Sequence, residues 1–144
     1  MKYQYFIASR WRNKDSVLEL TKKIREKGKT VYCFIEGDGT KYKLKDAEKK
    51  HAPEEFMKKF ESIPNWRSDP AVKEIFGVDM NALKQSDALI LLLPAGKSAH
   101  GEAGIAYGMG KRCIVIGEQK ETESFYFIFS EFYASIDDFV DSLN

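Results

Sequence analysis

Short runs of consecutive apolar residues alternate along the chain with segments in which apolar residues recur every three or four positions. Four runs rich in aromatic, branched and aliphatic residues predict buried strands, at residues 3–8, 30–35, 87–93 and 112–117. The third run, DALILLL, is apolar at consecutive positions, which is typical of a strand covered by helices on both faces. The pattern therefore predicts a parallel sheet between two layers of helices.

Helical periodicity fills the gaps between these runs. One helix is expected to begin near Asn13 or Asp15 and to end at Gly28. Another is expected to begin at Asp69-Pro70, because this pair is typical of an N-cap followed by proline at the first helical position. Alternating strands and helices predict an α/β fold: a doubly wound, Rossmann- or flavodoxin-like, mainly parallel sheet of four to five strands flanked by helices.

Two segments do not follow this alternation. Residues 36–52 are polar and rich in lysine, and a short helix is expected after them, so we interpret about 36–68 as an excursion within a single domain over residues 1–144. Residues 118–133 are ambiguous between helix and strand, and their many aromatic side chains indicate core or a dimer interface. A last helix is expected after Ser135, which has the spacing of an N-cap.

Charge and composition restrict the partners. The 23 basic and 22 acidic side chains leave a formal charge of +1, without the positive field that duplex nucleic acid or an anionic membrane requires. The apolar runs are too short to span a bilayer or to form a secretory leader. We therefore expect a cytoplasmic protein that binds neither a nucleic acid polymer nor a membrane.

The cysteines and histidines predict neither a disulfide nor a metal site. Cys33 and Cys113 each lie in an apolar run, so we interpret both as reduced core residues. Two histidines and two scattered cysteines do not have the spacing of metal ligands, and no cofactor is expected.

Chemically unusual residues follow the third expected strand. Gly101, Gly104 and Gly108 recur within one short helix, where each costs about 0.8–1 kcal/mol relative to alanine. Because these glycines have no side chains, we expect the helix to lie close to the sheet or to a ligand. Glu102 is expected in the first turn, where the helix dipole would keep it ionised, as suits a nucleophile. The alternative is a carboxylate that only stabilises the helix.

Asp79 is a second candidate. It lies near the inward edge of its expected helix, on the same turn as Ile75, Phe76 and Met80. A buried carboxylate without a partner is costly, so a functional role is one explanation of its place. The other is that Asp79 only borders the apolar stripe.

These residues resemble the nucleoside 2-deoxyribosyltransferase family. Tyr5-Phe6 matches the N-terminal Tyr-Phe of that family, and Asp79 stands eight residues before Asp87, as the active-site aspartate of the family stands before a strand-opening one. The related 2'-deoxynucleoside 5'-monophosphate N-glycosidases share these features and have a serine where this chain has Ser9. The main shared pattern is Glu102-x-Gly104-x-Ala106-x-x-x-Gly110-Lys111.

The resemblance covers about residues 3–117 and implies that Glu102 attacks the anomeric carbon of a nucleoside or nucleotide, forming a glycosyl-enzyme intermediate. It implies that Asp79 supports sugar placement or proton transfer, and that Tyr5 positions the nucleophile or the sugar. It also favours a homodimer or a higher homo-oligomer. The chain departs from the family at Gly96, where the transferases carry a base-contacting aspartate and the monophosphate hydrolases a serine. This departure puts base exchange in doubt.

The loop around Gly96 predicts an anion site. Lys97 and Ser98 precede a helix N-terminus, where free N–H groups and the helix dipole favour phosphate. Ser9 and Arg10 follow the first expected strand, which neighbours this loop in a doubly wound sheet. We interpret these four residues as contacts for a phosphate-bearing ligand. His100 is a further candidate, with an incidental exposed histidine as the alternative.

Three functions agree with the sequence. The first is an N-glycosidase or N-glycosyltransferase that acts on a nucleotide or nucleoside through a glutamate nucleophile. The second is a non-catalytic nucleotide-binding or sensing module, which Gly96 favours. The third is a Toll/interleukin-receptor-like domain that cleaves NAD or binds NAD derivatives. The sequence favours the first.

Overall fold

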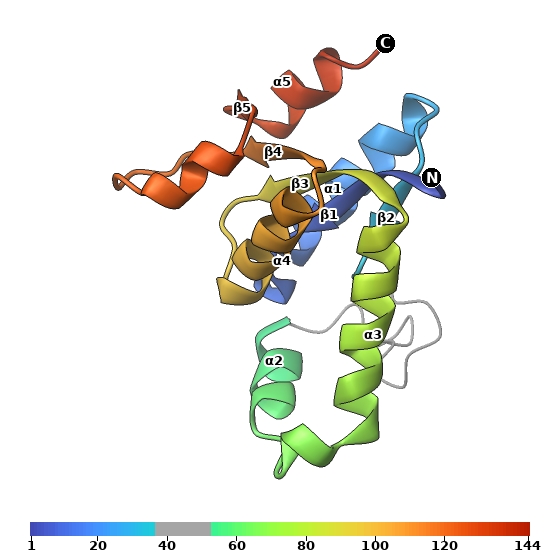
Figure 1. Cartoon of the computed structure of the whole chain (residues 1–144), viewed down its shortest axis with the longest axis vertical. Coiled ribbons are helices and arrows are strands. Elements are labelled where there is room, and N and C mark those ends of the chain that lie inside the picture. The colour runs from blue at the N-terminus through green and yellow to red at the C-terminus, as the bar shows by residue number, and fades with distance from the viewer. Residues whose placement is uncertain (37–52) are drawn as a thin grey trace.

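A five-stranded parallel β-sheet forms the centre of the molecule (Figure 1). The computed structural model describes residues 1–36 and 53–144. The strands are β1 Tyr3–Ala8, β2 Val31–Cys33, β3 Ser86–Leu92, β4 Arg112–Ile116 and β5 Glu131–Tyr133. They lie in the order β2-β1-β3-β4-β5, and all neighbouring pairs are parallel. The direction of winding therefore reverses between β1 and β3, and ligands bind outside the carboxyl ends of the strands at such a reversal.

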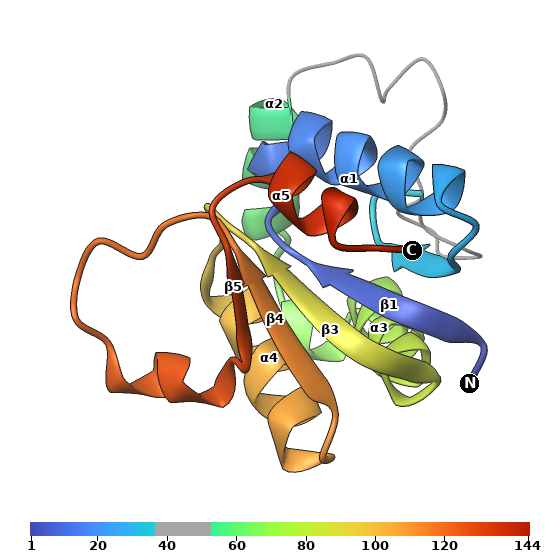
Figure 2. The same ribbon diagram turned by 90° about the horizontal axis from the view of Figure 1, so that it is seen from above.

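Helices cover both faces of the sheet (Figure 2). One face carries α1 Lys14–Glu26 and α5 Ile136–Asp141, and the other carries α3 Pro70–Lys84 and α4 Lys97–Gly108. The helix α2 Pro53–Glu61 is tied to the 3₁₀ turn Trp11–Asn13, which follows β1, by the ion pairs of Arg12 with Glu54 and Glu61. The predicted doubly wound α/β fold is confirmed.

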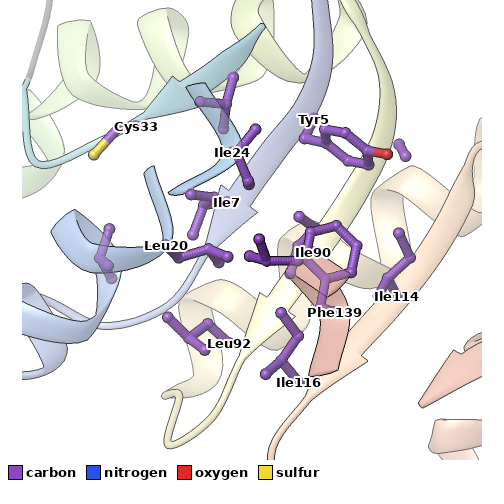
Figure 3. Close-up of a cluster of buried hydrophobic side chains, with 14 of the residues drawn as sticks. Tyr5, Ile7, Leu20, Ile24, Cys33, Ile90, Leu92, Ile114, Ile116 and Phe139 are labelled. Carbon is purple, nitrogen blue, oxygen red and sulfur yellow. The ribbon is translucent and has the colours of Figure 1, made fainter. Parts of the chain in front are cut away.

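The strands divide the core into two parts because successive side chains of a strand point to opposite faces. Tyr5 and Ile7 of β1 pack against α1 and α5 (Figure 3), whereas Phe6 and Ala8 pack against α3 and α4. In β3, residues 88–92 are all buried. The run DALILLL therefore has the covered position that its consecutive apolar residues predict.

The predicted helix caps are confirmed. The Asp69 carboxylate accepts hydrogen bonds from the backbone N–H of Ala71 at 2.8 Å and of Val72 at 3.3 Å, and Pro70 is the first residue of α3. The Ser135 hydroxyl accepts one from the backbone N–H of Asp138 at 3.1 Å and begins α5. Both side chains satisfy N–H groups that have no partner within their helix.

The ambiguous segment 118–133 folds into a 3₁₀ helix and an edge strand. Tyr126 and Phe129 are buried against the core, whereas Phe127 is 91% exposed and Phe132 is 63% exposed. Neither a helical nor an alternating pattern describes this mixture, which explains the ambiguity. Core is the correct interpretation for two of these aromatic residues, and the dimer interface stays a prediction. The 3₁₀ helix is η4, Ser124–Ile128.

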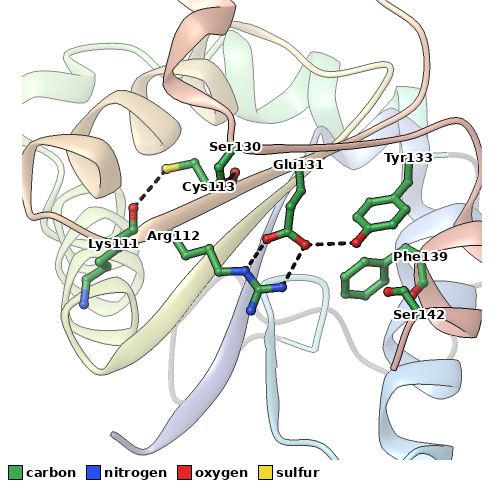
Figure 4. A network of polar contacts seen from close by, with 8 residues as sticks. All are labelled: Lys111, Arg112, Cys113, Ser130, Glu131, Tyr133, Phe139 and Ser142. Atoms are coloured by element: carbon green, nitrogen blue, oxygen red, sulfur yellow. Dashed lines mark hydrogen bonds and ion pairs between the residues drawn. The ribbon is translucent and has the colours of Figure 1, made fainter. Parts of the chain in front are cut away.

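A polar network ties the edge strand β5 to β4 (Figure 4). The Arg112 guanidinium pairs with the Glu131 carboxylate, which also accepts a 2.9 Å hydrogen bond from the Tyr133 hydroxyl. The Arg112 charge lowers the pKa of Glu131, so this carboxylate stays ionised in the pair. The network supports a strand of only three residues.

Other expectations have simple outcomes. Cys33 and Cys113 are buried and unpaired, as predicted. Most of the lysine-rich segment 36–52 lies outside the described residues, so the interpretation of that segment stays a prediction. Among the helices of residues 1–36 and 53–144, none has both the length and the apolar character that crossing a bilayer requires.

Candidate active site

Two carboxylates from different helices lie on the same face of the sheet. Asp79 comes from α3, four residues before the fully buried Leu83, and therefore lies on the inward side of the helix. Glu102 comes from α4 and shares an inward ridge with the buried Ala99 and Ala106. Both carboxylates are partly buried. Because α4 begins just after the carboxyl end of β3, Glu102 lies near the edge where this class of fold binds ligands.

Tyr32 of β2 joins this pair. Its hydroxyl donates a 2.8 Å hydrogen bond to Oδ1 of Asp79. The Tyr32 side chain is 6% exposed, its ring stacks on Phe6 with centroids 5.2 Å apart, and it meets Tyr3 edge-on at 5.6 Å. The pairing of β1 with β2 places Tyr32 directly beside Phe6. These contacts hold the hydroxyl against Asp79.

The three groups perturb the protonation of one another. Burial raises the pKa of Asp79, and the hydrogen bond from Tyr32 opposes this rise. Burial also raises the pKa of Glu102, and the negative charge of Asp79 raises it further, to about 8. Burial and the Asp79 charge raise the pKa of Tyr32, so its hydroxyl keeps its proton. Burial therefore favours the neutral form of Glu102 and of Asp79, and the hydrogen bond from Tyr32 favours the ionised form of Asp79 alone.

The expectation that the helix dipole keeps Glu102 ionised is wrong. Since α4 begins at Lys97, Glu102 lies in its second turn, and the effect of the dipole fades within the first. At this depth burial and the neighbouring carboxylate decide the protonation, and both favour the neutral acid.

The glycines of α4 do not face the sheet, contrary to one of the two expectations for them. A Cβ atom on Gly104 would lie 3.6 Å from the ring of Phe125 in η4, and Cβ atoms on Gly101 and Gly108 would meet nothing within 4 Å. The close contact of α4 with the sheet is made instead by three buried alanines, Ala99, Ala103 and Ala106. That the other glycines leave room for a ligand stays a prediction.

Ser9 and His100 hold the loop that leads into α4. The Ser9 hydroxyl donates a 2.8 Å hydrogen bond to the Leu92 carbonyl at the end of β3. The His100 ring lies between two oxygens, with Nδ1 2.7 Å from the Gly96 carbonyl and Nε2 2.8 Å from the Tyr126 hydroxyl. Because a carbonyl can only accept, a neutral His100 carries its proton on Nδ1 and accepts from Tyr126.

The remaining residues of the predicted anion site lie at the surface. Gly96 is the N-cap of α4 and offers no side chain to its first turn. Lys97 and Ser98 follow it and are exposed, and Arg10 is exposed just beyond the end of β1. All of these lie at the carboxyl edge of the sheet, like Glu102, and their contact with a phosphate stays a prediction.

The structure is similar to that of the 2-deoxyribosyltransferase from the psychrotolerant bacterium Bacillus psychrosaccharolyticus. The similarity covers 95% of this chain and 90% of that chain, with a TM-score of 0.59 and 14% sequence identity. The chain has the fold of a 2-deoxyribosyltransferase. That enzyme is described as a biocatalyst for the synthesis of antiviral and antitumoral nucleosides. No family model matches the sequence, and a search of curated proteins finds no match.

Within this fold, Tyr5 is not brought to the carboxylate pair. Its ring lies on the face of the sheet covered by α1 and α5, where it meets Phe139 edge-on at 5.6 Å. Asp79 and Glu102 lie on the other face, with Tyr32. Tyr32 could not be singled out from the sequence, because its contact with Asp79 depends on the register of β2 in the sheet. The only sequence signal for it is a polar hydroxyl inside an apolar run.

Other features of the described residues do not add to this site. In that part of the chain, no three His, Cys, Asp or Glu side chains are grouped so that they could hold a metal ion. A hollow of about 410 Å³ lies along α1, on the opposite face of the sheet. It is lined by Leu18, Thr21, Lys22, Arg25, Glu26 and Glu36. The carboxylate pair is therefore the feature on which a function can be based.

Proposed function

We propose that this protein cleaves the N-glycosidic bond of a nucleoside or nucleotide, with Glu102 as the nucleophile and Asp79 as its acid–base partner. The observation that supports the proposal is the interaction of two carboxylates on one face of the sheet, where burial and the negative charge of Asp79 raise the pKa of Glu102. Retaining cleavage of a glycoside uses one carboxylate to attack the sugar and one carboxyl group to manage the proton. The fold supports a nucleoside as the substrate, because the similar enzyme makes nucleosides.

The first step moves one proton and exchanges one bond. Glu102 passes its proton to Asp79, and the resulting carboxylate forms a bond to the anomeric carbon. The bond from that carbon to the base breaks, and its electron pair leaves with the base, which takes the proton from Asp79. In the second step a water oxygen attacks the anomeric carbon and releases Glu102, while a proton of that water returns to the pair.

Water is the expected acceptor because of Gly96. Glycine places no side chain where the transferases of the resembled family carry a base-contacting aspartate, so a second base has no such partner here. We therefore favour hydrolysis over base exchange. The exposed Lys97, Ser98 and Arg10, with Ser9 beneath them, are the groups we expect near the phosphate of a nucleotide substrate.

The test is the release of free base. The protein is incubated with a panel of ribonucleosides, deoxyribonucleosides and their 5'-monophosphates, and the products are separated by chromatography. We expect release by the wild-type protein and a loss of about a thousandfold or more in Glu102→Gln. Glu74→Gln is the matched control, because Glu74 is exposed on the outside of α3. Equal rates in the wild type and Glu102→Gln would overturn the proposal.

Two other results would also overturn it. Stabilisation by nucleotides in a thermal-shift assay, with no base released over a long incubation, would identify a binding module instead. Release of nicotinamide from NAD, with none of the nucleosides or monophosphates cleaved, would identify an NAD-cleaving domain.

A further inference from the structure

We propose that Tyr32 is a positioning residue that holds Asp79 in its ionised form and thereby determines the pH range in which the carboxylate pair carries a single proton. The inference deepens the proposed function, because the single proton is what the first step moves. It rests on the geometry of the Tyr32 hydroxyl, which donates a hydrogen bond to Asp79.

The Tyr32 hydroxyl has a fixed direction. Its 2.8 Å hydrogen bond to Oδ1 of Asp79 joins β2 to α3, across 47 positions of the chain. The ring lies between Phe6, on which it stacks with an interplanar angle of 20°, and Tyr3, which it meets at 61°. The ring cannot rotate away without losing both contacts, so the hydroxyl stays hydrogen-bonded to Asp79.

In the described part of the chain, few other charged or titratable groups face Asp79. The neighbouring elements contribute Tyr32 from β2 and Glu102 from α4, Tyr3 of β1 lies against the Tyr32 ring, and β3 presents apolar side chains to α3. Arg67, in the turn before α3, lies over the ring of Trp66. Among the described residues no cation pairs with Asp79 or Glu102. The Tyr32 hydroxyl is therefore the donor that offsets the burial of the Asp79 charge.

Removal of this donor should raise the pH at which Asp79 takes up a proton. Without the hydrogen bond, the ionised form of Asp79 is less stable, so Asp79 takes up a proton at a higher pH than in the wild type. The pair then holds two protons over a wider acidic range, and neither carboxylate can attack. Because a hydrogen bond to a charged group is worth more than a neutral one, the ionisation constant of Asp79 should fall by about ten- to a hundredfold.

Tyr32→Phe tests the role, since phenylalanine keeps the ring and its packing and removes only the hydroxyl. In the substrate-free protein, ¹³C NMR of the side-chain carboxyl carbons follows the titration of Asp79. We expect its midpoint to move to higher pH in Tyr32→Phe. Tyr3→Phe is the matched control, because it removes a hydroxyl from the adjacent ring. In this variant the midpoint of the Asp79 titration should equal that of the wild type. An unchanged Asp79 midpoint in Tyr32→Phe would overturn the inference.

The pH dependence of base release gives a second readout. In Tyr32→Phe the midpoint of the acid limb of kcat/KM should move to higher pH by the same amount as the midpoint of the Asp79 titration. A residue that only supports the fold would lower the rate equally at every pH, and that result would overturn the inference. The NMR titration needs no substrate. An absence of base release would therefore count against the proposed function, whereas the NMR titration would still decide the role of Tyr32.

A measurement on the wild type covers the case in which Tyr32→Phe does not fold. The hydroxyl proton of Tyr32 should be visible by ¹H NMR, because a buried hydrogen-bonded proton exchanges slowly, and its chemical shift should follow the ionisation of Asp79. A hydroxyl resonance that does not change through that titration would overturn the inference.

Discussion

Replacement of Glu102 by glutamine should stabilise the protein, and the gain should grow with pH. Glutamate ordinarily ionises with a pKa of 4.5, whereas burial and the charge of Asp79 raise the pKa of Glu102 to about 8. A raised pKa contributes stability that is complete below about 4.5 and is lost as the pH rises through about 8. Ionisation in the unfolded chain therefore lowers the stability of the wild type by up to about 3 kcal/mol at pH 7 and about 5 kcal/mol at pH 9. These values are upper bounds because the side chain is partly exposed to water.

Urea unfolding of the wild type and Glu102→Gln at about pH 5, 7 and 9 measures this gain. Glutamine has almost the same shape as glutamate and carries no charge, so the difference in unfolding free energy should rise from under about 1 kcal/mol at pH 5 towards the upper values. Glu74→Gln, on the exposed side of α3, should show no comparable rise. A gain that is equal at the three pH values would show that Glu102 is not held in its neutral form, and would refute the reasoning. The same variant should also lose the proposed base release, because glutamine cannot attack the sugar as a carboxylate does.

Three further substitutions test the fold, each by urea unfolding at neutral pH. Asp69→Ala should lower the unfolding free energy by about 1 kcal/mol, because α3 loses its N-cap, and Asp69→Ser should restore most of the loss. Gly117→Ala should lower it by about 1–3 kcal/mol, because this glycine has a φ of +112° and a Cβ atom would lie 2.8 Å from Cβ of Leu93. Phe139→Ala should lower it by about 3–5 kcal/mol, since the ring is fully buried, whereas Phe127→Ala at a side chain that is 91% exposed should change it little. Comparable losses for Phe127→Ala and Phe139→Ala would contradict the placement of the core.

The architecture could be predicted because it depends on local patterns. The run DALILLL indicates a strand covered on both faces, and Asp69-Pro70 indicates where α3 begins. Asp79 could be singled out as a carboxylate at the inward edge of a helix, and Glu102 by its place near the start of the glycine-bearing helix after β3 and by the resemblance to the transferase family. The aromatic segment 118–133 could not be assigned, because its buried and exposed rings alternate without one period.

The protonation of the site could not be predicted. The sequence places Glu102 near the start of a helix and suggests an ionised side chain, but burial and the charge of Asp79, more than twenty residues earlier in the chain, raise its pKa. The role expected for Tyr5 also depends on which face of β1 it occupies, and the packing turns it towards α1 and α5. Tyr32, by contrast, was not expected at the site and lies there, because the pairing of β2 with β1 turns it towards Asp79.

The sequence by itself determined the alternation of the first four strands with helices and the starts of α3 and α5, since each of these depends on neighbours within a few positions. The tertiary structure alone decided that Asp79 and Glu102 lie on one face of the sheet, where burial raises the pKa of both, and that the Tyr32 hydroxyl donates a hydrogen bond to Asp79. The physical reason is that a pKa responds to burial and to charges across space, and only the folded chain brings β2, α3 and α4 together.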